Sequence, residues 1–169
     1  MNIILYNAVS LDGFIATLEG DSDWVSDVDA EVFEAKCKEA GCILVGRKTF
    51  EQFPELYPMD GVENIVLTRD ETMSSANERV HFVHSVQEAV EAAEKFEYQT
   101  AILAGGSKAN SSFLKAGFVN EIYLSVHPLA LGEGLKMFGE QGEGLSFKLL
   151  DVTELGEGLV LLHYTLVSS

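Results

Sequence analysis

Glycine, hydroxyl-bearing and charged residues follow four apolar segments of the chain, at the points where those segments end. They stand in SLDG at 10–13, GRKTF at 46–50, LTRD at 67–70 and AGGSK at 104–108. Glycine lets a backbone approach a ligand closely, and a helix N-terminus favours an anion. Arg47, Lys48 and Arg69 add cations to a chain whose net charge is −16. The joint pattern predicts a site for a multiply charged anion such as a phosphorylated dinucleotide.

Each feature also has a simpler interpretation when it is taken alone. A Gly105–Gly106 turn between a strand and a helix often serves steric needs only, and a single arginine is usually a solvated surface charge. No phosphate-loop motif occurs, and the glycines at 132–134 do not continue as G-x-G-x-x-G. The sequence therefore gives little support to an ordinary Rossmann fold. The dinucleotide hypothesis depends on the four segments lying together.

Two carboxylates are candidates for catalysis. Asp29 follows Trp24 by five positions and Ser26 by three. A buried carboxylate can act as an acid or hydrogen-bond a heterocycle. Alternatively, Asp29 only completes a capping box with Ser26 at a helix N-terminus. Asp12, in the second position of the LDG sequence, either forms a turn or contacts a substrate.

The histidines and cysteines do not predict a metal site. His81 and His84 stand three apart on a predicted strand, so their side chains point to opposite faces. His127 is either a substrate contact or a structural residue at a strand end. The spacing of Cys37 and Cys42 matches neither a redox pair nor a zinc pair, and it predicts two buried free thiols.

The elements that must position these residues alternate between strands and helices. Strands are predicted at 2–9, 42–46, 64–68, 80–83 and 100–104, and helices at 26–40, 47–53, 85–96 and 107–116. Residues 10–24 are predicted as a loop, and three strands at 119–127, 145–153 and 159–167 follow without a helix between them. The predicted fold class is α/β: a mixed sheet of about eight strands, mostly parallel with an antiparallel C-terminal edge, flanked by helices on both faces.

Composition limits the partners of this chain. Residues 1–169 are expected to form a single domain, with 47% hydrophobic and 22% charged residues. No apolar stretch approaches the ~20 residues of a membrane span, and the start does not resemble a signal peptide. We therefore expect no membrane partner and a cytoplasmic location. The excess of 27 acidic over 11 basic residues disfavours nucleic acid.

Several motifs together resemble a known superfamily. GRKTFE, NIVLTR, HSVQEAV and AILAGGS, in this order, are similar to the cofactor half of the dihydrofolate reductases. VSLDGFIA at 9–16 and HPLALGEGLKMF at 127–138 resemble one branch, the riboflavin-biosynthesis reductases with a RibD C-terminal-like domain. The resemblance covers almost the whole chain. It implies a dihydrofolate reductase-like fold, NADPH as the hydride donor, and a homodimer formed through the final strands and residues 127–138.

The resemblance also implies where NADPH binds. Backbone groups at the nicotinamide carboxamide would come from Ala8 and Ile15. Residues at the pyrophosphate and the adenosine 2′-phosphate would be Gly46, Arg47, Lys48 and Thr49. Residues near the adenosine and its adenine would be Thr68, Arg69 and Ser85. Backbone N–H groups for the pyrophosphate and the nicotinamide ribose would come from Gly105, Gly106 and Ser107.

On the substrate side the resemblance is looser. Dihydrofolate reductases carry an acidic residue five positions after a tryptophan, which Trp24 and Asp29 reproduce without the flanking prolines. Asp29 and Asp12 are thus the catalytic candidates, and Trp24 and His127 the substrate-binding candidates. The predicted function is an NADPH-dependent reductase of a small heterocyclic or ribosylamino-pyrimidine substrate, similar to 5-amino-6-(5-phosphoribosylamino)uracil reductase. Dihydrofolate reduction and a non-catalytic nucleotide-binding module are the alternatives.

Overall fold

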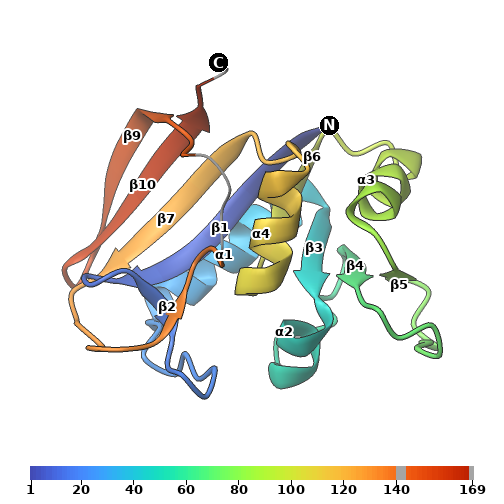
Figure 1. The fold of residues 1–169 in the computed structure, drawn as a ribbon, viewed down its shortest axis with the longest axis horizontal. Helices are drawn as coiled ribbons and strands as arrows, with labels where there is room; N and C mark the ends of the chain where they lie inside the picture. Colours follow the sequence, from blue (N-terminus) through green and yellow to red (C-terminus); the bar gives the residue numbers. More distant parts are fainter. Residues whose placement is uncertain (140–143, 168–169) are drawn as a thin grey trace.

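An eight-stranded sheet forms the centre of the computed structural model, which describes residues 1–139 and 144–167 (Figure 1). The strand order is β5-β4-β3-β6-β1-β7-β10-β9. In chain order the strands are β1 (Asn2–Ser10), β3 (Cys42–Gly46), β4 (Glu63–Leu67), β5 (Val80–Val83), β6 (Thr100–Leu103), β7 (Glu121–His127), β9 (Phe147–Gly156) and β10 (Leu159–Leu166). The six strands β5, β4, β3, β6, β1 and β7 run parallel to one another. Strand β10 pairs antiparallel with β7, and β9 pairs antiparallel with β10. The predicted mixed sheet is confirmed.

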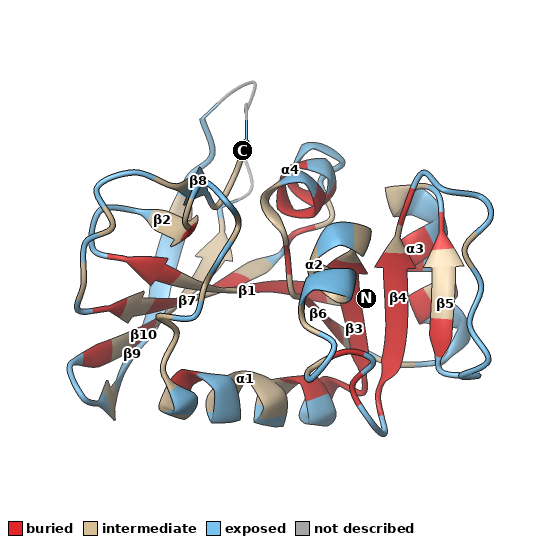
Figure 2. Ribbon diagram, turned by 90° about the horizontal axis from the view of Figure 1, so that it is seen from below, coloured by how far each residue is buried: buried red, intermediate tan, exposed pale blue. Residues whose placement is uncertain are grey.

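Helices cover both faces of this sheet, as predicted. They are α1 (Asp27–Ala40), α2 (Arg47–Gln52), α3 (Val86–Lys95) and α4 (Ser107–Lys115). In Figure 2, α1 lies along one side of the sheet and α4 along the other. Ala40 of α1 belongs to one apolar core with Ile43, while Val90 of α3 and Phe113 of α4 share the opposite core with Leu5. The central parallel strands are buried on both faces, which explains their continuous apolar sequences.

The prediction that residues 10–24 form only a loop was wrong in one part. Phe14–Ala16 forms strand β2, which pairs antiparallel with β8 (Leu135–Lys136) in a separate two-stranded sheet. Strands of three and two residues are too short to show a period in the sequence. Their pairing also joins segments about 120 positions apart, so no local sequence pattern predicts it.

The outer strand β9 has an exposed apolar surface. Leu149, Leu150 and Val152 are 46%, 49% and 54% exposed. Strand β9 is also the last strand of its sheet, so no other strand of residues 1–139 and 144–167 covers its outer edge. Among the residues that the structure describes, no helix has the length and apolarity needed to cross a membrane.

Candidate functional site

Two glycine turns touch at the edge of the sheet where the parallel strands end. The N–H of Gly46, after β3, donates to the carbonyl of Gly105, after β6, at 2.7 Å. The peptide bond between Gly105 and Gly106 is cis, and Gly105 has a φ of +97°. A Cβ placed on Gly106 would lie 3.0 Å from Thr49 Oγ1. The structure therefore brings together two of the segments, GRKTF and AGGSK, that the sequence marked as candidates for one site.

The helices that begin at these two turns differ from the others in their caps. Helices α1 and α3 begin after Ser26 and Ser85, whose hydroxyls accept from the backbone N–H groups of Asp29 and Glu88. Helices α2 and α4 begin after Gly46 and Gly106 and have no side-chain cap. The first N–H groups of a helix need an acceptor from outside the helix. At α4, which starts beside Gly105, these groups are free of side-chain competition for an anion.

Two asparagines that sequence reasoning missed hold this edge together. Asn110 Nδ2 in α4 donates to Asn7 Oδ1 in β1 at 2.7 Å and to the carbonyl of Met137 at 3.0 Å. Asn110 is fully buried, and its Oδ1 has no partner among the described residues. A Cβ on Gly105 would lie 3.5 Å from Asn7 Nδ2. The available signal was a polar residue between Ala109 and Phe113 on the apolar face of a predicted helix.

The turn between β1 and β2, which carries Asp12, is tied to a distant segment. Asp12 accepts from Ser10 Oγ at 2.6 Å, from the Gly132 N–H at 2.7 Å and from the Leu131 N–H at 3.1 Å. The Ser10 hydroxyl and then the Gly132 amide lower the pKa of Asp12 to about 2. Since the ordinary pKa is 3.8, the ionised carboxylate supports this loop above that pH and loses its effect as the pH falls towards 2.

These contacts bear on the catalytic candidacy of Asp12. Its carboxylate oxygens are engaged by Ser10 of the same turn and by the Leu131 and Gly132 amides of a distant segment, which is a structural role. Ala8 of β1 and Ile15 of β2 are half-buried, so both can still be reached from outside. A role of Asp12 in substrate contact stays a prediction.

The predicted cations lie at the same edge but meet acidic neighbours. Arg47 Nη1 is 3.3 Å from the Glu51 carboxylate, and both side chains are more than a third exposed. The positive charge of Arg47 also helps lower the pKa of Asp70, after a larger effect of the Thr72 hydroxyl. Lys48 and Arg69 are exposed. Exposed pairs of this kind contribute little to stability, so Arg47 is available to a stronger anionic partner.

Thr68 and Ser85 have structural contacts of their own. Thr68 Oγ1 accepts from the Asp70 N–H at 3.0 Å, which shapes the turn after β4. Ser85 caps α3 through the Glu88 N–H at 3.1 Å. His84 Nδ1 lies 3.2 Å from the Thr68 carbonyl, so these two turns are neighbours. Their predicted place near the adenosine remains a prediction.

Asp29 forms a buried pair with Tyr6. Tyr6 in β1 donates its hydroxyl to Asp29 Oδ1 at 2.5 Å, and Asp29 is only 2% exposed. Burial, followed by the negative charge of Asp29, raises the pKa of Tyr6 far above its usual range. The proposed capping box is half correct: Ser26 caps Asp29, but the carboxylate does not return to Ser26. The Ser26 N–H instead donates to His127 Nε2 at 3.2 Å.

Trp24 and His127 complete this region. Their rings meet edge to face with centroids 5.2 Å apart. His127 is buried, and its two ring nitrogens face the Ser26 N–H and the Ser125 carbonyl. This histidine therefore braces the start of α1, which was the structural alternative for it. The buried Trp24 Nε1 and Ser125 Oγ have no partner among the described residues.

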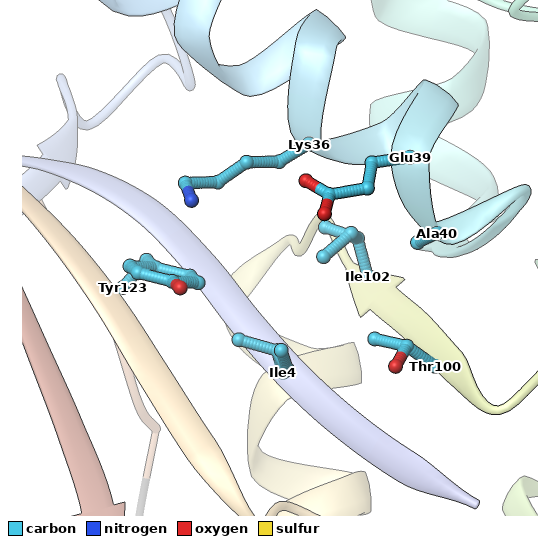
Figure 3. A pocket seen from close by; sticks show the side chains of 7 residues that line it. All are labelled: Ile4, Lys36, Glu39, Ala40, Thr100, Ile102 and Tyr123. Carbon is cyan, nitrogen blue, oxygen red and sulfur yellow. The ribbon is translucent and has the colours of Figure 1, made fainter.

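The structure contains a cavity at the start of α4 and another between α1 and the sheet. One of about 420 Å³ is lined by Ser107 at the start of α4 and by residues of the 134–139 segment, including Lys136. Another of about 250 Å³ opens between α1 and the sheet, where Lys36 and Glu39 of the helix face Tyr123, Thr100 and Ile102 (Figure 3). Lys36 Nζ lies 3.9 Å from the centre of the Tyr123 ring. Only the first cavity reaches a residue predicted to bind the cofactor.

The remaining candidates for metal or thiol chemistry do not gather. Within residues 1–139 and 144–167, no three metal-ligating side chains come together. Cys37 and Cys42 are buried and free, as predicted. Burial raises the pKa of Cys42 to about 12, which keeps its thiol protonated and unreactive.

The order and direction of the strands, with helices on both faces, give the chain a dihydrofolate reductase-like fold. One solved structure with this fold is dihydrofolate reductase from Enterococcus faecalis in complex with NADP(H), with a TM-score of 0.79 and 22% identity over 99% of this chain and 97% of that one. Residues 1–161 match the RibD C-terminal domain, and the chain belongs to this reductase family.

Two relatives illustrate the range of the family. The uncharacterized protein YwjB of Bacillus subtilis is 30% identical over 95% of each chain. The riboflavin biosynthesis protein RibD of Aquifex aeolicus is 26% identical over 94% of this chain but only 56% of its own length. The resemblance noted in the sequence to the riboflavin-biosynthesis reductase branch is thereby confirmed.

Proposed function

We propose that this protein is an NADPH-dependent reductase of a small heterocyclic or ribosylamino-pyrimidine compound. The observation that carries the proposal is the meeting of the Gly46 and Gly105–Gly106 turns, each followed by a helix without a side-chain cap. Glycine turns and open helix N-termini are what a pyrophosphate requires. NADPH, when bound, supplies a hydride to the substrate.

The residues at this edge fit such a cofactor. Glycine at 106 leaves the backbone of this turn without a side chain, and a Cβ there would lie only 3.0 Å from Thr49 Oγ1. The α4 N–H groups and Ser107 would hold the pyrophosphate, and Arg47 with Lys48 or Arg69 would hold the 2′-phosphate. The cavity of about 420 Å³ beside Ser107 would take the neighbouring ribose.

Cofactor choice provides the direct test. Binding measured by fluorescence titration is expected to favour NADPH over NADH at least tenfold, because each charge-assisted contact to the 2′-phosphate contributes about 1.5–3 kcal/mol. Arg69→Gln should reduce this preference without changing NADH affinity. Lys38→Gln, which removes an exposed lysine of α1, is the matched control and should leave the preference unchanged. Equal affinity for the two nucleotides in the wild type would contradict the proposal.

The substrate class is inferred from the family and from the region around Asp29. The family includes riboflavin-biosynthesis proteins, and the Asp29 region offers unpartnered polar atoms to a heterocycle. NADPH oxidation in the presence of aminopyrimidines and dihydropteridines separates the preferred reaction from dihydrofolate reduction. A protein that binds NADPH but oxidises it with neither class would be the non-catalytic nucleotide-binding module. A cytoplasmic location stays a prediction.

We also propose that the protein is a homodimer. The exposed apolar side chains of Leu149, Leu150 and Val152 on the outermost strand β9 are the features that support it. Light scattering at micromolar concentration is expected to report twice the monomer mass. Val152→Lys should shift the measured mass to that of a monomer. Lys148→Glu, on the same strand, should change the measured mass less. A wild-type monomer at this concentration would rule the dimer out.

A further inference from the structure

The cavity of about 250 Å³ between α1 and the sheet lies at the opposite end of β6 from the glycine turns (Figure 3). Its floor is formed by the buried side chains of Ile4 in β1 and Ile102 in β6. Thr100, which also lines it, is the first residue of β6, whereas Gly105 lies just beyond the last. A strand rises ~3.3 Å per residue, so roughly 15 Å separates Thr100 from Gly105. The cavity is therefore distinct from the proposed cofactor site.

Two side chains of opposite charge line this cavity, and both come from α1. Lys36 is half-buried and Glu39 is exposed, and Figure 3 shows both extending from the helix above the floor. Within residues 1–139 and 144–167, neither side chain takes part in an ion pair, whereas Lys38 of the same helix pairs with Glu34. The cavity thus combines an apolar floor with one positive and one negative group that a ligand can engage.

The ring of Tyr123, in β7, holds the ammonium group in position. Lys36 Nζ lies 3.9 Å from the centre of this ring. The ring is itself fixed by His163 of β10, which stacks on it with centroids 4.2 Å apart, and His163 Nε2 lies 2.6 Å from Glu121 Oε2. A cation above an aromatic ring is attracted to its face and keeps its N–H groups as donors. Lys36 is therefore placed at the cavity and can still donate to an anion.

We infer that this cavity binds a small aliphatic amino acid. The carboxylate of the ligand would accept from Lys36, its ammonium group would donate to Glu39, and its apolar side chain would lie on Ile4 and Ile102. Hydrogen bonds between charged groups at both ends are stronger than neutral ones. The volume is below the ~300–1,000 Å³ of pockets for drug-sized ligands, so the occupant must be small. This binding site does not depend on the proposed reductase function.

The test compares L-leucine with two analogues that each lack one of its charges. Isocaproate has no ammonium group, and isoamylamine has no carboxylate. Calorimetric titration of the whole protein at millimolar probe concentrations is expected to show L-leucine binding at least tenfold more tightly than either analogue, because each analogue leaves one charged side chain without a partner. An analogue that binds as tightly as L-leucine would overturn the amino acid as the occupant. Absence of L-leucine binding would overturn the site.

Variants of the lining residues show where L-leucine binds. Lys36→Gln and Glu39→Gln should each weaken its binding at least tenfold. Lys38→Gln, on the same helix but outside the lining of the cavity, is the matched control and should leave the affinity unchanged. Thr100→Leu keeps both charges but adds apolar volume to the cavity, so it should also weaken binding. A melting curve of each variant shows that the titrated protein is folded. An unchanged affinity in Lys36→Gln or in Thr100→Leu would place L-leucine elsewhere and overturn the inference.

Discussion

Gly106→Val is expected to weaken NADPH binding at least tenfold, or about 1.4 kcal/mol, while the protein stays folded. A side chain at this position would occupy the surface on which we place the pyrophosphate. Its Cβ would also lie 3.0 Å from Thr49 Oγ1, so Thr49 would have to give way by a few tenths of an ångström. Affinity is measured by fluorescence titration well below the melting temperature.

The backbone of Gly106 makes this variant a clean test. Its φ is −73°, a torsion open to valine, and a melting curve of the variant separates a loss of affinity from a loss of folded protein. Gly105, with a φ of +97°, provides the contrast. Gly105→Ala should lower the free energy of unfolding by roughly 1–3 kcal/mol, because a Cβ is disfavoured there. A folded Gly106→Val protein with normal NADPH affinity would exclude the turn as the cofactor site.

Asp29→Asn is expected to lower the rate of substrate reduction by about 10²–10⁴-fold, the range associated with general acid catalysis. The amide oxygen can still accept the Tyr6 hydroxyl, which the wild-type carboxylate accepts at 2.5 Å, so the fold should be nearly unaffected. The measurements are kcat at saturating NADPH, with the proposed pyrimidine substrate, and the melting temperature.

A matched control lies in the same helical turn. Asp27 also stands in the first turn of α1, but it is exposed, and Asp27→Asn should retain the wild-type rate. If Asp29 serves only to anchor α1 to β1, Asp29→Asn will lose activity no faster than it loses folded protein. That result would assign the residue a structural role and remove it from the reaction.

Local patterns were sufficient for the arrangement of the elements. The apolar run CILVG and the alternation of strands and helices predicted the parallel part of the sheet, because burial on both faces demands continuous apolar strands. The sequence also predicted the glycine turn after β6, because the apolar segment of that strand ends at Gly105 and Gly106. Proximity of the turns followed from topology, as parallel strands end at one edge.

The tertiary structure alone decided which polar side chains meet. Tyr6 and Asp29 are 23 positions apart, Asn7 and Asn110 are 103 apart, and Asp12 reaches a backbone amide 120 positions away. A hydrogen bond of this kind leaves no period or spacing in the sequence, because its partners come together only when the chain packs. The sequence by itself therefore determined the eight-stranded sheet and the glycine edge of the site, but not the small β2–β8 sheet. The pairing that constrains Asp29 depended on where β1 and α1 pack against each other, since only that contact places the Tyr6 hydroxyl at the carboxylate.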